Sequence, residues 1–202
     1  MTEASEREAH HQRQMMRKKA VVDAAIAGAD QDKGLLLVLT GNGKGKSSSA
    51  FGMVARTLGY GLKAGVLQFI KSRHDTGEEK FLGSQPNVQW QVLGDGFTWD
   101  TQNRDADIAS AQHAWKIAQS LLNDASLHLL VLDELTYLLS YGYLDVQQVC
   151  ADLAARPPMQ HVVITGRAAP ECLLEMADTV SEIQDVKHAF RAGVRAQPGI
   201  DL

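Results

Sequence analysis

Residues 35–49 read LLLVLTGNGKGKSSS, an apolar run followed by a glycine-rich turn and by the start of a helix predicted over Ser47–Leu58. Strand, loop, Gly-Lys-Ser and helix stand in the order that a phosphate-binding loop requires. Glycines let backbone N–H groups point inward at an anion, and the helix N-terminus adds partial positive charge. The segment therefore predicts binding of a nucleoside triphosphate, with contacts from Gly41, Asn42, Gly43, Lys44, Gly45, Lys46, Ser47 and Ser48.

Two side chains of this loop carry specific expected roles. Lys46 places an ammonium against phosphate oxygens, and the Ser47 hydroxyl can coordinate a divalent ion that is bound to the phosphates. The loop departs from the common form GxxxxGK[ST], because Thr40 occupies the first-glycine position and the glycine is displaced to Gly41. A glycine-rich hairpin or linker is the alternative, and the order of strand, loop and helix argues against it.

Short apolar runs alternate with helical stretches from Leu35 onward. Runs that are apolar along their whole length and separated by helices are typical of a parallel sheet covered on both faces. The expected strands are Leu35–Leu39, Gly65–Ile70, Val88–Leu93, Leu127–Leu132, Val162–Thr165 and, more weakly, Thr179–Ile183. Further helices are expected over Asp145–Ala155 and from the 3-4-3-4 spacing of Ile108, Ala111, Trp115, Ala118 and Leu122. The fold class is α/β, a mostly parallel sheet flanked by helices.

The first 33 residues differ in composition from the rest of the chain. They hold six acidic and six basic residues and no proline, and apolar residues are sparse. Met15, Val22 and Ile26 lie seven and four apart, so they could share one side of a helix, but the stripe is too thin to bury itself. A frayed, solvated arm and a helix that docks on something else both remain open. We expect an N-terminal helical arm or lid over residues 1–33 and a nucleotide-binding domain over residues 34–202.

Composition excludes several classes of protein. The 202 residues carry a net charge of −4, which argues against a broad basic surface for nucleic acid. No apolar run approaches the roughly 18–20 residues of a membrane span, and the N-terminus lacks the apolar core of a signal peptide, so a cytoplasmic protein is expected. Cys150 and Cys172 form no CxxC pattern, so neither a disulfide scaffold nor a structural zinc site is indicated.

A second apolar strand, residues 127–132, ends in the carboxylates Asp133 and Glu134. At the carboxyl edge of a parallel sheet these side chains would face the phosphate loop, where one could hold magnesium and the other position a nucleophile. The alternative is that the pair caps the next helix. Arg167 follows another strand and is expected either to contact phosphate or to face solvent.

Residues 94–104 read GDGFTWDTQNR and follow the strand predicted over Val88–Leu93. Two aromatic residues, Phe97 and Trp99, stand among polar ones, which is unusual for a solvent loop and suits a platform for a large flat ligand. Packing of the two rings onto the core is the alternative interpretation.

Together these residues resemble the corrinoid adenosyltransferases of the bacterial cobalamin pathway, of the P-loop type. The resemblance extends from about Leu35 to Leu202, and more loosely from Gln12. GFTWDTQNR and the ending KHAF to GID are specific to that family, whereas the phosphate loop alone is not; serines stand at 47 and 48 where threonines are usual. The matching segments are TGNGKGKS (40–47), VLQFIK (66–71), GFTWDTQNR (96–104), LDELTY (132–137), TGR (165–167) and residues 178–201.

The resemblance implies a RecA-like P-loop NTPase fold, a homodimer, and transfer of the 5′-deoxyadenosyl group of ATP to cobalt(I) of cobalamin or its precursors, with inorganic triphosphate leaving. It implies Mg²⁺ (or Mn²⁺) held by Ser47 and Glu134, and a flavoprotein or flavodoxin-type reductant as electron donor. The expected catalytic residues are Lys46, Phe97, Trp99 and Glu134, with Arg167 as a further ATP contact. An ATPase or kinase, and a non-enzymatic carrier of ATP or corrinoid, remain as other functions.

Overall fold

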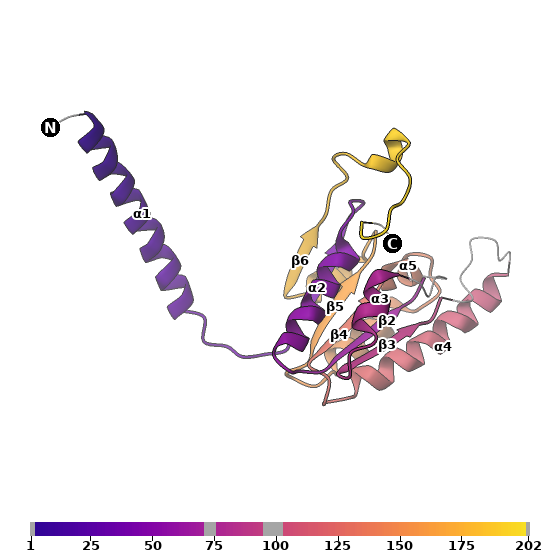
Figure 1. Ribbon diagram of the computed structural model, residues 1–202. Coiled ribbons are helices and arrows are strands. Elements are labelled where there is room, and N and C mark those ends of the chain that lie inside the picture. Colours follow the sequence, from indigo (N-terminus) through magenta and orange to yellow (C-terminus); the bar gives the residue numbers. More distant parts are fainter. Residues whose placement is uncertain (1–2, 71–75, 95–102, 201–202) are drawn as a thin grey trace. The chain divides into compact units, whose positions relative to one another are not determined.

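Six short segments form one sheet in the second of the two units of the chain, which are Met1–Asp32 and Lys33–Leu202. The computed structural model describes residues 3–70, 76–94 and 103–200 (Figure 1). The strands are β1 (Leu36–Thr40), β2 (Ala64–Gln68), β3 (Val88–Val92), β4 (Leu129–Asp133), β5 (His161–Thr165) and β6 (Thr179–Glu182). The helices are α1 (Glu3–Ala27), α2 (Lys46–Gly59), α3 (Gly77–Leu82), α4 (Arg104–Leu122), α5 (Leu135–Ser140), α6 (Val146–Ala154), α7 (Glu171–Met176) and the 3₁₀ turn η1 (Ala189–Ala192).

The strand order is β3-β2-β4-β5-β1-β6, and each pairing is parallel. All strands therefore end at the same edge of the sheet, where the residues that follow β1, β4 and β5 come together. The glycine-rich loop joins β1 to α2 at this edge. This arrangement confirms the expected α/β class and P-loop NTPase fold.

Alternate side chains of the central strands supply two separate cores, because successive residues of a strand point to opposite faces. On one face, Leu130 and Leu132 of β4 pack in a core that includes Trp115 of α4 and residues of α5, α6 and α7. On the other face, Leu129 and Val131 of the same strand pack with α2 and α3. Helices thus cover both faces, as the apolar strands predict, and leave the carboxyl edge for the site.

Most predicted elements lie within two residues of their observed positions. The helix predicted over Ser47–Leu58 is observed as Lys46–Gly59, and the helical stripe that ends at Leu122 lies within α4. The side chain of Asp145 accepts a hydrogen bond from the N–H of Gln147 and caps α6. Three helices of six residues, α3, α5 and α7, were not predicted.

The first unit consists mainly of α1, which is 25 residues long. All side chains described for this helix, from Glu6 to Ala27, are exposed, including the three apolar residues Met15, Val22 and Ile26. No helix among the described residues is long and apolar enough to span a membrane.

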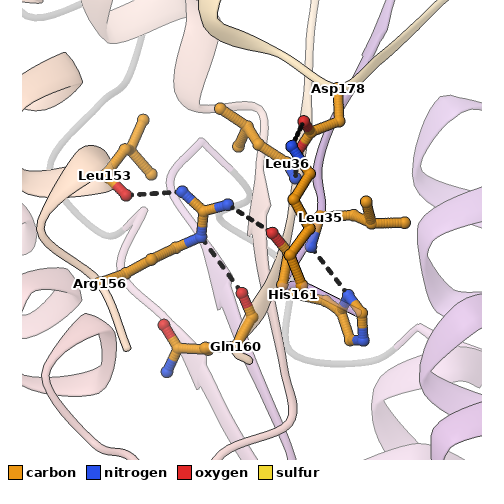
Figure 2. A network of polar contacts seen from close by, with 9 residues as sticks. Leu35, Leu36, Leu153, Arg156, Gln160, His161 and Asp178 are labelled. Atoms are coloured by element: carbon orange, nitrogen blue, oxygen red, sulfur yellow. Dashed lines mark hydrogen bonds and ion pairs between the residues drawn. The ribbon is translucent and has the colours of Figure 1, made fainter. Parts of the chain in front are cut away.

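Arg156 joins α6 to the beginning of β1 at the amino edge of the sheet (Figure 2). Its guanidinium donates hydrogen bonds to the carbonyls of Leu153 (2.7 Å), Gly34 (2.9 Å) and Gln160 (3.2 Å). One side chain thus satisfies three carbonyl groups from three segments, and it fixes the point at which the chain enters the sheet.

Two further side chains bind the backbone where β1 begins (Figure 2). The ring Nδ1 of His161 accepts a hydrogen bond from the N–H of Leu35 at 3.0 Å, and the Asp178 carboxylate accepts one from the N–H of Leu36 at 2.9 Å. Asp178 also forms an ion pair with Lys33. The strand that carries the phosphate loop is therefore anchored at its other end by side chains of β5 and of the segment before β6.

Candidate active site

The phosphate loop spans the five residues between β1 and α2, as predicted from the sequence. Gly45 occupies the N-cap position of α2 with φ 118° and ψ −2°, a left-handed conformation that side chains rarely adopt. At the beginning of α2, Lys46 is buried and Ser47 half-buried, whereas Ser48 is exposed. Asn42 and Lys44 of the loop are also exposed. Among these five side chains, that of Lys46 is the buried one.

Lys46 is the central charge of the site. Its Nζ donates a hydrogen bond to the carbonyl of Gly43 at 2.8 Å. Burial lowers the pKa of Lys46 most, and the charge of Arg167 lowers it further, while Glu134 and then Asp133 act in the opposite direction. Two carboxylates at the end of β4 and a guanidinium from the loop after β5 are thus within electrostatic range of this ammonium. A poorly hydrated ammonium of this kind gains strongly from an anionic ligand.

Asp133 holds the ends of the central strands together. Its side chain is fully buried, and its two oxygens accept hydrogen bonds from Gln68 Nε2 (2.9 Å) and Thr165 Oγ1 (2.8 Å). Gln68 in turn accepts a hydrogen bond from the indole N–H of Trp90 at 3.2 Å. This network spans β3, β2, β4 and β5. Asp133 therefore has a positioning role in the structure.

Glu134 follows directly in the chain and differs from Asp133 in its backbone. It has φ 63° and ψ 22°, a left-handed conformation that is uncommon for a residue other than glycine and is enriched at functional sites. Its N–H donates to Thr165 Oγ1 at 2.9 Å, so this hydroxyl links the two acidic residues. Although Glu134 occupies the N-cap position of α5, its side chain makes no capping hydrogen bond. The helix-capping alternative therefore does not describe Glu134.

Arg167 lies in the loop after β5, with an exposed side chain. Its carbonyl accepts a hydrogen bond from Thr136 Oγ1 at 2.6 Å, which ties the loop to α5. Its charge also lowers the pKa of Tyr137, although burial and then Glu134 raise that pKa by more. The structure thus brings Arg167 to the same edge as Lys46 and Glu134.

The predicted aromatic residues Phe97 and Trp99 lie outside the described residues. The elements on either side of them are described. β3 ends at Val92, at the carboxyl edge, and Asn103 caps α4 by accepting a hydrogen bond from the N–H of Ala106 at 3.2 Å. The chain therefore leaves the sheet toward this segment at the edge that carries the phosphate loop.

The donor set at this edge fits a magnesium ion that is bound mainly by phosphate. Mg²⁺ prefers hard oxygen ligands and commonly takes only one or two from the protein. Oε2 of Glu134 is buried, and the Ser47 hydroxyl lies in the first turn of α2. Both oxygens of Asp133 already accept side-chain hydrogen bonds, which favours Glu134. Within the described residues no group of three or more His, Cys, Asp or Glu could hold a metal by itself.

Three positioning residues, Gln68, Thr165 and Thr136, were not singled out from the sequence. Each forms a hydrogen bond that fixes a carboxylate or a loop of the site. The signal that could have found Gln68 and Thr165 is a polar residue at the end of an otherwise apolar strand. Thr136 lies in a helix too short to give a periodic pattern.

Comparisons with known proteins agree with this geometry. A family model described as ATP:corrinoid adenosyltransferase BtuR/CobO/CobP matches residues 32–202. The chain is 56% identical to the corrinoid adenosyltransferase of Pseudomonas aeruginosa over 203 residues, which is all of both chains. It is 49% identical to that of Escherichia coli K12 (95% of this chain, 97% of the other) and 48% identical to corrinoid adenosyltransferase CobA of Salmonella typhimurium (95% and 97%).

Among solved structures, domain III of the replication initiation protein DnaA from Thermotoga maritima matches with a TM-score of 0.38 and 12% identity. The match covers 73% of this chain and 53% of that chain. A similarity of this size adds nothing to the fold assigned from the sheet order.

Proposed function

The chain belongs to the ATP:corrinoid adenosyltransferase family, and from this premise we propose that it transfers the 5′-deoxyadenosyl group of ATP to cobalt(I) and releases inorganic triphosphate. Adenosyl transfer from ATP to a corrinoid is the activity of the family. Beyond that activity, we propose that the cobalt is in the +1 oxidation state and that the leaving group is inorganic triphosphate. The observation that carries the proposal is the buried Lys46 of the phosphate loop, which lies within electrostatic range of Glu134 and Arg167.

The proposed reaction is a nucleophilic substitution at carbon. An electron pair of cobalt(I) forms the Co–C bond to C5′, the C5′–O bond breaks, and its electron pair stays on the triphosphate. Negative charge therefore increases on the leaving group, and the site must stabilise that charge. Preorganised donors aimed at developing charge commonly supply the largest share of catalysis. In this chain the donors are the N–H groups of the loop, the Lys46 ammonium and the Arg167 guanidinium.

We propose that Glu134 and Ser47 hold the Mg²⁺ or Mn²⁺ ion. When bound, the ion neutralises part of the charge on the phosphates. Asp133 positions Glu134 through Thr165, since the Thr165 hydroxyl donates to the carboxylate of Asp133 and accepts from the N–H of Glu134. The buried network thus keeps the proposed metal ligand in place without taking up its carboxylate.

The proposal includes several partners. The substrate is cobalamin or a corrinoid precursor, the working unit is a homodimer, and a flavoprotein or flavodoxin-type protein supplies the electron that reduces cobalt(II). The reaction is placed in the cytoplasm, as the sequence predicts.

One incubation of the protein with ATP, Mg²⁺ and chemically reduced cobalamin tests the proposed reaction. We expect a Co–C bond in the absorption spectrum and stoichiometric inorganic triphosphate. ADP with phosphate would indicate an ATPase, and intact ATP with bound corrinoid would indicate a carrier. Pyrophosphate with phosphate in place of triphosphate would contradict the proposed leaving group.

A further inference from the structure

The C-terminal segment, residues 183–200, is attached to the phosphate loop backbone to backbone. The N–H of Ile183 donates to the carbonyl of Thr40 (2.8 Å), and the N–H of Gly43 donates to the carbonyl of Ile183 (2.6 Å). A Cβ atom on Gly43 would lie 2.5 Å from the carbonyl oxygen of Gln184, so only glycine allows this approach. Figure 1 shows the segment rising from β6 and arching beside the N-terminus of α2.

The segment then reverses direction through the turn η1. Nδ1 of His188 accepts a hydrogen bond from the N–H of Phe190 at 3.2 Å, and the turn ends at Gly193 in a left-handed conformation. The N–H of Val194 returns a hydrogen bond to the carbonyl of Ala189 at 3.2 Å. Residues before and after the turn therefore face one another. Farther on, Ile200 lines a second cavity together with residues of α2 and α3.

Between the two arms of this reversal lies a cavity of about 320 Å³ whose lining is basic. Its charged groups come from three places in the chain, namely the phosphate loop, the arm before η1 and the arm after it. Phe190, Val194 and Ile200 contribute apolar walls. The polar groups are those of Lys44, Lys187, His188, Arg195 and Gln197.

Two cations of this cavity, Lys187 and Arg195, have no acidic partner among the described residues. No described acidic residue lines the cavity. Arg191, in the same segment, pairs instead with Asp185 and does not line the cavity. Cations gathered around one cavity repel one another, and an anion with several oxygens would relieve that repulsion.

We propose that this cavity is a second phosphate subsite, which holds one end of a polyphosphate chain whose other phosphates lie in the loop. Arg195 suits paired phosphate oxygens, and Lys44 and Lys187 provide point charges. Because Nδ1 of His188 accepts a backbone hydrogen bond, the neutral ring carries its proton on Nε2, where it can be donated to an oxyanion. The subsite rests on the proposed function, since it would bind the triphosphate both in ATP and as the leaving group.

Calorimetric titration of the full-length protein with inorganic triphosphate tests the subsite without turnover. We expect the double variant Lys187→Gln/Arg195→Gln to bind triphosphate about tenfold or more weakly, because it loses two charge-assisted contacts. Arg191→Gln is the control, since it removes one positive charge of the same segment that lies outside the cavity. It should bind within about twofold of the wild type.

The oxyanion in this cavity could also come from cobalamin, whose nucleotide loop contains a phosphodiester. Kinetics with two corrinoids distinguish this source from triphosphate. We expect KM for cobalamin, and for a corrinoid that lacks this loop, to be equal in the double variant and the wild type. A rise in KM for cobalamin alone, with unchanged triphosphate affinity, would overturn the proposal. Equal triphosphate affinity in all three proteins would overturn it as well. If the expected loss of affinity occurs but the wild type forms no Co–C bond, the subsite stands and the proposed function fails.

Discussion

Lys46 is buried and lies near two carboxylates and the Arg167 guanidinium. Its burial and these charges determine the effect that we expect from its removal. We expect Lys46→Ala to lower kcat/KM by roughly two to three orders of magnitude. This corresponds to about 3–4 kcal/mol of lost transition-state stabilisation, as for removal of one preorganised charge-stabilising donor. Burial is the largest cause of the lowered pKa of Lys46, so its ammonium is poorly compensated in the folded protein without ligand. The melting temperature of the variant should therefore not fall. Near-normal kcat/KM, measured with saturating Mg²⁺, would contradict the assignment of the loop.

The two neighbouring carboxylates should give opposite phenotypes. Glu134→Gln should raise the Mg²⁺ concentration needed for turnover and leave the melting temperature unchanged, because we propose that Glu134 holds the metal. Asp133→Asn should lower the melting temperature, since an amide places an N–H₂ group against the donor of Gln68 or Thr165. Metal titrations of activity together with thermal denaturation measure both effects. An unchanged metal dependence in Glu134→Gln would indicate that Asp133 binds the metal or that both carboxylates have only a structural role.

Phe97 and Trp99 carry the prediction that is most specific to corrinoid chemistry. Cobalt(II) in cobalamin keeps an axial ligand that disfavours its reduction, and apolar rings can exclude this ligand without offering another donor. We expect Phe97→Ala and Trp99→Ala to bind ATP normally and to fail with cob(II)alamin under mild reductant. Pre-formed cob(I)alamin should restore much of the activity, because only positioning is then lost.

Spectra of cob(II)alamin bound with ATP provide the direct measurement for this wedge. The wild type should show a four-coordinate species that both variants lack. Phe81→Ala is a suitable control, because Phe81 is an aromatic residue of α3 that is 68% exposed. If the two variants generate the four-coordinate species as well as the wild type does, the rings serve only in packing.

Strands were more predictable from this sequence than short helices. β1 and β4 consist of Leu and Val except for their last residue, and β5 has Val and Ile at its three central positions. A central parallel strand is buried on both faces, so the apolar run itself marks the element. α3, α5 and α7 have six residues each, fewer than two turns, so no periodic pattern can develop. Their positions follow from tertiary packing, which composition does not encode locally.

The same distinction applies to the site. The placement of Lys46, Glu134 and Arg167 at the carboxyl edge was predictable because each directly follows a recognisable strand or loop. The cavity around Lys187 and Arg195 was not, because it depends on a chain reversal at Gly193 and on hydrogen bonds between Ile183 and the loop. Contacts between segments about 140 residues apart leave no local pattern in the sequence.

The junction at the beginning of β1 gives the fold a pH-dependent element. Burial lowers the pKa of His161, and the charges of Arg156 and His128 lower it further. The folded state therefore binds a proton less readily than the unfolded chain, whose histidine titrates near 6.5. Stability should be full above about pH 6.5 and should fall as the pH decreases below that value. Protonation of Nδ1 would also remove the hydrogen bond from Leu35.

Thermal denaturation between pH 7.5 and 5 tests this junction. His161→Gln should reduce the loss of melting temperature across this range, because the variant has no titrating group at this position. His113→Gln, which changes an exposed histidine of α4, should behave as the wild type. The Asp178 carboxyl titrates below this range, since Lys33 and the N–H of Leu36 lower its pKa. Equal pH dependence in all three proteins would exclude His161 as the cause.

The division of the chain into two units bears on the whole molecule. The family model covers the P-loop unit from residue 32 onward and does not include α1. Yet α1 is a 25-residue helix whose apolar side chains Met15, Val22 and Ile26 are 50–67% exposed. An isolated helix is only marginally stable in water, and packing of an apolar face normally supplies the missing stability. We therefore propose that α1 acts as a lid over the corrinoid, on its own subunit or on that of a dimer partner.

Deletion of residues 1–30 should raise KM for the corrinoid and leave the affinity for ATP unchanged, because the phosphate loop and its charged partners all lie within the second unit. Steady-state kinetics and calorimetric titration with ATP give the two quantities. The full-length triple variant Met15→Gln/Val22→Gln/Ile26→Gln should reproduce the rise in KM, because it removes the apolar stripe and retains the arm. Substitution of three polar residues of α1, Gln12→Ala/Gln14→Ala/Lys18→Ala, is the matched control and should have little effect. Sedimentation of each protein shows whether the dimer persists, so that a loss of assembly is distinguished from a loss of the lid. Equal kinetics for the truncated and full-length proteins would contradict the lid and indicate that residues 1–30 are a solvated arm without a role in binding.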